Sequence, residues 1–140
     1  MGRVWGTSEG VTVDRIASAW LVRRFVDAEA RLSFVDGHGY VPAEGEVRFD
    51  MFEAEFTHEG DLCTFEVMAR HFAPNDAALR QVGEIVHDVD LKDGKFERAE
   101  AAGLARLLTG LALREPDDEA RVAKGSLLFD SLYESFRREP

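Results

Sequence analysis

The segments FTHEGDLCTFE (residues 56–66) and EIVHDVDLKD (residues 84–93) lie near the middle of the chain, and the predicted fold is arranged around them. Together they contain two of the four histidines, the single cysteine and a dense set of carboxylates. These residue types bind metal ions and exchange protons. We therefore expect the chemistry of this protein to lie in the region between residues 55 and 95.

The first segment predicts a turn followed by a helix. Gly60-Asp61 is typical of a turn in which the Asp side chain caps the helix that follows, here expected over residues 62–72. On that helix Cys63 and Glu66 share one face, opposite the apolar face. His58 precedes the turn, so its ring can reach the same space.

The second segment predicts another helix, capped by Asn75-Asp76. Its core stripe consists of four apolar residues at helical spacing, namely Leu79, Val82, Val86 and Val89. His87 lies off that stripe, and Asp90 follows it by one turn, so the two side chains can point together.

If the polar faces of these two helices meet, they form a site for a divalent transition metal ion with mixed ligands. The ligands that we predict from this arrangement are His58, Glu66, His87 and Asp90. The alternative is structural: the acidic residues of the second helix also suit a solvated face, His87 can pair locally, and a single Cys is often a small buried apolar residue.

Length and composition limit the classes of protein that are compatible with the chain. Its 140 residues suffice for a single domain, 1–140, with its own core. A net charge of −10 argues against binding to nucleic acid or to an anionic membrane, and a bound oxyanion would need a locally positive pocket. The single Cys and the absence of a signal-peptide or membrane-spanning pattern favour a cytoplasmic protein.

The flanking segments predict an α+β fold that is mostly helical, with about five helices around a small sheet of short strands. Short strands are expected at 32–35, 47–49 and 52–56, and Phe52 is expected to face the core because apolar and polar residues alternate there. A helix that is apolar almost all round is expected from residue 14 to residue 25, and such a helix is buried. Two further amphipathic helices follow residue 98, and their exposed parts could form a homodimer face.

Two cations accompany the predicted site. Arg15 stands beside Asp14 at the start of the first helix, where it either forms a structural ion pair or belongs to a pocket wall. Lys92 lies at the end of the second segment, where it either supplies positive charge to an anion or is an ordinary surface residue.

Three runs also resemble a known family: VDRIASAWLVRRF (13–25), EFTHEGDLCTFE (55–66) and IVHDVDLKD (85–93). They resemble the ChrB-type chromate resistance proteins, in the same order, and the resemblance extends over about residues 11–136. In that family this region often follows a different N-terminal segment, so the chain looks like the ChrB C-terminal domain standing alone. The resemblance implies a role in sensing or resisting chromate.

Three functions are therefore compatible with the sequence. The first is a cytoplasmic chromate-resistance-type domain whose metal site holds a small oxyanion, with Arg15 or Lys92 assisting. The second is a metal-dependent enzyme acting on a small molecule, in which Glu66 or Asp88 is the general base and Cys63 is a ligand or nucleophile. The third is a non-catalytic partner or regulatory domain with solvated polar faces.

Overall fold

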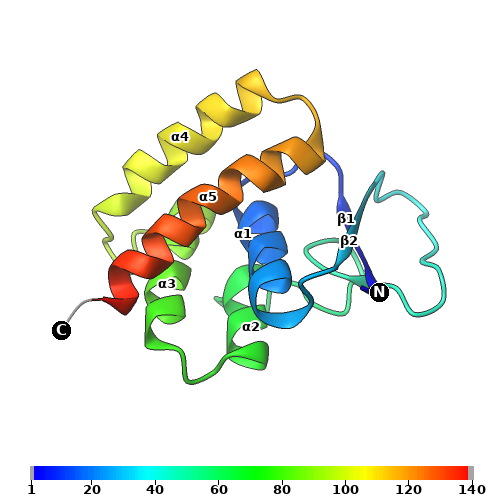
Figure 1. Cartoon of the computed structure of the whole chain (residues 1–140), viewed down its shortest axis with the longest axis horizontal. Coiled ribbons are helices and arrows are strands. Elements are labelled where there is room, and N and C mark those ends of the chain that lie inside the picture. Colours follow the sequence, from blue (N-terminus) through cyan, green and yellow to red (C-terminus); the bar gives the residue numbers. More distant parts are fainter. Residues whose placement is uncertain (1, 139–140) are drawn as a thin grey trace.

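The computed structural model describes residues 2–138. A small parallel sheet forms at the side of the molecule where the chain begins (Figure 1). Its strands are β1 (Val4–Ser8), β2 (Arg31–Val35) and β3 (Val47–Arg48), in the spatial order β2-β1-β3. Parallel neighbours need a crossover connection, and the first helix supplies the one from β1 to β2. The central strand contributes the buried Trp5, which pairs with Leu32 on one side and Val47 on the other.

Five α-helices make up most of the rest of the described chain. They are α1 (Val13–Leu21), α2 (Thr64–Phe72), α3 (Ala77–Leu91), α4 (Glu100–Arg114) and α5 (Asp118–Arg137), and a π-helical turn (Val22–Val26) extends α1. Figure 1 shows α4 and α5 side by side, with α1, α2 and α3 beneath α5. The predicted α+β fold, mostly helical with a small sheet, is confirmed. None of the helices in the described chain has the length and apolar character needed to cross a membrane.

Helix α1 runs through the centre of the core, as its apolar sequence predicts. Trp20 stacks on Phe65 of α2 at a centroid distance of 6.3 Å and contacts Phe129 of α5 at 5.7 Å. Helix α5 approaches α1 closely because it carries Gly125, where a Cβ atom would lie only 2.6 Å from the Ile16 side chain. This packing holds α1 and α2 in a fixed relation, which matters for the site.

The predicted strand at 52–56 is wrong. Asp50 and Glu53 both adopt a positive φ, so the chain turns there instead of extending, and Phe52 is 82% exposed. Only Phe56 forms a bridge, with Phe49. Alternation of apolar and polar residues cannot distinguish a strand from such a turn, because the left-handed residues that break the pattern are not glycines.

The helix start predicted near Leu62 is displaced by two residues. Helix α2 begins at Thr64 with Cys63 as its N-cap, and Asp61 instead forms an ion pair with Lys95. The predicted start of α3 is confirmed, since the Asp76 side chain accepts a hydrogen bond from the Leu79 N–H group at 2.9 Å.

Candidate metal centre

Asp14 is the residue around which the candidate site is built. It lies in the first turn of α1 and is only 2% exposed. Its carboxylate accepts hydrogen bonds from the N–H groups of Thr64 at 3.1 Å and Phe65 at 2.8 Å. These are free N–H groups of the first turn of α2, so a carboxylate on one helix satisfies the N-terminus of another.

His58 brings two more carboxylates to the same place. Its Nε2 atom lies 3.2 Å from Asp14 Oδ2, 3.6 Å from Asp90 Oδ2 and 3.7 Å from Asp50 Oδ1. We call these four residues, Asp14, Asp50, His58 and Asp90, the acid–histidine cluster. The His58 side chain is 42% exposed, so the cluster opens to solvent on one side.

The electrostatics of the cluster favour a bound cation. Burial, together with the nearby carboxylates of Asp50 and Asp90, raises the pKa of Asp14 from 3.8 to about 7, against the opposing effect of the two α2 N–H groups. Burial and the Asp50 carboxylate likewise raise the pKa of Asp90. Like charges this close disfavour the ionised carboxylates, and a positive ion would reverse that effect.

The donor atoms also fit a metal ion. Asp14, His58 and Asp90 each offer one ligand atom, and these atoms all lie within 4.8 Å of one another. Carboxylate oxygen and imidazole nitrogen form a donor set that divalent transition metals accept. Arg15 lies at the edge of the cluster, where its Nε donates to the Asp50 carbonyl oxygen at 3.1 Å and lies 3.5 Å from the Asp50 carboxylate.

Glu66 and His87, two of the four predicted ligands, lie in a separate group. The His87 ring is fully buried, with Nδ1 2.6 Å from Glu66 Oε1 and Nε2 2.9 Å from Asp93 Oδ2. The expected pairing of His87 with Asp90 does not occur, because both ring nitrogens already have these partners. Lys92, in the left-handed conformation at φ 55°, ends α3 and turns the chain so that Asp93 reaches back to the ring.

The geometry does not favour the catalytic roles expected for Cys63 and Asp88. Cys63 is completely buried, and this burial raises the pKa of its thiol, so the reactive thiolate is disfavoured. The two Asp88 oxygens accept hydrogen bonds from the N–H groups of Phe96 at 3.1 Å and Arg98 at 2.8 Å. Asp88 therefore holds the loop between α3 and α4.

Sequence reasoning missed Asp14 and Asp50 as members of the site and Asp93 as the partner of His87. Asp14 stands at a helix start, where acidic residues are common for reasons of capping and dipole, so its position gives no functional signal. Asp50 lies between two segments that we expected to be strands, 47–49 and 52–56, so nothing marked it as a site residue. Lys92 lines a surface hollow that also includes Asp90, about 590 Å³ in volume.

Fold and cluster together define a class of protein, an α+β domain in which α1, α3 and the segment between β3 and α2 hold a partly buried group of three Asp and one His. Residues 5–136 match the family model described as "ChrB, C-terminal domain". The chain therefore belongs to the ChrB C-terminal domain family, and the predicted resemblance is confirmed.

One curated relative illustrates this membership. Protein ChrB of Cupriavidus metallidurans is 37% identical over 136 residues, which cover 96% of this chain and 41% of that protein. The chain thus spans about two fifths of the length of the relative. No solved structure matches the chain.

Proposed function

We propose that this chain is a cytoplasmic domain of the chromate-resistance type that binds a divalent transition metal ion at the acid–histidine cluster and a small oxyanion beside it. The observation that carries the proposal is the set of three carboxylates around His58, one of them on the buried Asp14. Such a set is costly when every carboxylate is ionised and is stabilised by a cation.

Asp14, His58 and Asp90 would hold the metal, which would supply positive charge for an oxyanion in a strongly acidic protein. The N–H groups of Thr64 and Phe65 orient the Asp14 carboxylate. Arg15, held in place by Asp50, adds a guanidinium at the edge of the cluster where an anion would approach. The domain would act in sensing chromate or in resistance to it.

Metal affinity tests the first half of this proposal. Metal-free protein titrated with Zn²⁺ or Ni²⁺ in a calorimeter should bind one ion, and His58→Gln and Asp14→Asn should weaken binding by about tenfold or more. His38→Gln is the matched control, because His38 is an exposed histidine whose Nδ1 lies 2.8 Å from Asp36. Wild-type affinity in the His58 variant, or equal loss in the His38 variant, would contradict the assignment.

Chromate binding tests the second half. Equilibrium dialysis should show chromate bound by the metal-loaded protein, with less bound after Arg15→Gln and none after chelation. If chromate bound equally with and without metal, the oxyanion would not bind at the acid–histidine cluster, and this half of the proposal would be wrong.

A second candidate function is a metal-dependent enzyme, favoured by the 42% exposure of the His58 side chain. A metal there would be accessible to water or a substrate, as catalytic sites require. Turnover in a small-molecule screen that disappears with a chelator and in His58→Gln would favour this function over sensing.

A further inference from the structure

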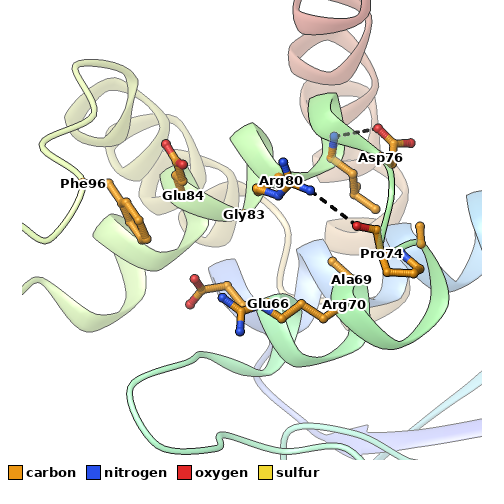
Figure 2. Close-up of a pocket in the computed structure, with 11 residues that line it drawn as sticks. Glu66, Ala69, Arg70, Pro74, Asp76, Arg80, Gly83, Glu84 and Phe96 are labelled. Carbon is orange, nitrogen blue, oxygen red and sulfur yellow. Dashed lines mark hydrogen bonds between the residues drawn. The ribbon is translucent and has the colours of Figure 1, made fainter.

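A second cavity, separate from the acid–histidine cluster, lies between α2 and α3 (Figure 2). It has a volume of about 120 Å³, and we call it the α2–α3 cleft. Its walls are partly apolar, from Ala69, Leu79 and Phe96. Its charged lining residues are Glu66, Arg70, Asp76, Arg80 and Glu84.

Glu66 presents an unused acceptor to this cleft. Its side chain is more than nine-tenths buried, and its two hydrogen bonds, from the Cys63 N–H at 3.0 Å and with His87 Nδ1 at 2.6 Å, both involve Oε1. Among residues 2–138, no donor reaches the other oxygen, Oε2. Oε2 is open to the cleft and not enclosed by protein atoms, so it can accept a hydrogen bond from a ligand that enters there.

Two arginines line the same cleft without a carboxylate partner. Arg70, one turn after Glu66 on α2, makes no ion pair or hydrogen bond with any described residue. Arg80 on α3 only donates to the Pro74 carbonyl oxygen, at 3.4 Å (Figure 2). Glu84, in contrast, is already paired with Arg98. The two guanidinium groups therefore remain available to a carboxylate from outside.

The cleft thus combines a carboxylate acceptor, two guanidinium groups and apolar walls in a small volume. We propose that it binds a small α-amino acid with an apolar side chain. The ammonium group would donate to Glu66 Oε2, the carboxylate would meet Arg70 and Arg80, and the side chain would lie against Leu79 and Phe96. A dipolar ligand satisfies both kinds of charge, whereas a simple anion would leave Glu66 Oε2 without a donor.

L-valine is a suitable probe, with isovalerate and isobutylamine as ligands that lack its ammonium and its carboxylate, respectively. In ¹H–¹⁵N NMR titrations at constant pH and ionic strength, L-valine should shift amide signals of α2 and α3 with a Kd in the millimolar range or below. Isovalerate and isobutylamine, which each carry only one of the two charges, should bind at least about tenfold more weakly than L-valine. Equal binding of isovalerate, or no shift with L-valine, would overturn the proposal.

Exposed arginines allow a test that does not depend on the buried Glu66. Arg70→Gln and Arg80→Gln should each weaken L-valine binding by about tenfold, while Arg106→Gln, an exposed arginine on α4, should leave it unchanged. L-valine should also bind normally in the presence of a chelator, which separates this site from the proposed metal centre. Wild-type affinity in both cleft variants would overturn the assignment.

Discussion

His87 is buried between two carboxylates, and this arrangement affects its protonation. Burial alone opposes the charged imidazolium, but the hydrogen bonds with Glu66 and Asp93 outweigh it and raise the pKa of His87 above 6.5. A raised pKa means that the charged ring stabilises the fold. That contribution is fully present below pH 6.5 and is lost as the pH rises through the folded-state pKa.

The pKa of His87 can be measured directly by NMR titration of the histidine ring. We expect a value above 6.5 in the wild type and a lower value in Asp93→Asn, because one of the two stabilising partners is then neutral. Asp36→Asn, which changes the partner of the exposed His38, is the control and should not affect His87. A His87 pKa at or below 6.5, or one unchanged by Asp93→Asn, would contradict the role of this pair.

Cys63 provides a second prediction for a single residue. Because its thiol is completely buried and its pKa is raised, a thiol-specific reagent should label it only as fast as the protein unfolds. Cys63→Ala should lower the free energy of unfolding by about 1–2 kcal/mol through lost packing. It should leave metal affinity unchanged. Rapid labelling of the native protein, or loss of metal binding in the variant, would show that Cys63 belongs to the metal centre.

The close contact between α1 and α5 makes a prediction for these elements. A methyl group at Gly125 would lie 2.6 Å from Ile16 Cγ2 in the core, so Gly125→Ala should lower the free energy of unfolding by about 1–3 kcal/mol. Gly103 on α4 is the matched control, because nothing lies within 4 Å of an added Cβ there. Gly103→Ala should stabilise the protein by about 0.5–1 kcal/mol, since Ala favours helix more than Gly.

Urea unfolding of the two variants, followed by circular dichroism, measures this difference. Equal stability of Gly125→Ala and Gly103→Ala would show that α1 and α5 do not pack as closely as the structure places them. A smaller loss for Gly125→Ala in an Ile16→Ala background than in the wild type would identify the contact responsible, because Ala lacks the Cγ2 atom.

Stability of the whole molecule should depend on pH and on metal together. The pKa of Asp14 is about 7 in the folded protein and 3.8 ordinarily. Its protonation therefore stabilises the fold fully below about pH 4, and this contribution is lost as the pH rises through 7. A bound cation can replace the proton, so metal should stabilise the protein more at alkaline pH than at acidic pH.

Thermal unfolding with and without Ni²⁺ at two pH values tests this dependence. At a fixed Ni²⁺ concentration of about 100 times the Kd at pH 8, the metal should add about 2.7 kcal/mol to the free energy of unfolding at that pH. The two pH values, 8 and 5, are about 3 units apart and lie on either side of the pKa of Asp14. The rise in Tm should be larger at pH 8. Asp14→Asn should lose most of the rise, and His38→Gln should keep it. A rise of equal size at both pH values would exclude ionisation of the cluster as its cause.

Local patterns in the sequence determined the elements and the family. Helical periodicity and the capping residue Asp76 predict α3, the apolar circumference of residues 14–25 predicts the buried α1, and three separated motifs predict membership of the ChrB family. These features depend on residues a few positions apart, so they can be read along the chain. The predicted strand at 52–56 failed because Asp50 and Glu53 turn the chain in a conformation that their residue types do not signal.

Only the tertiary structure decided which side chains meet. Asp14 and His58 are 44 positions apart, and His87 and Glu66 are 21 apart, so no periodicity relates them. The packing of α1 against α2 and α3 places Asp14 and Asp90 beside His58. The left-handed turn at Lys92 brings Asp93 to the His87 ring, which therefore pairs with Asp93 instead of Asp90. The residue types of the site follow from the sequence, but their grouping depends on the relative placement of helices, which core packing sets.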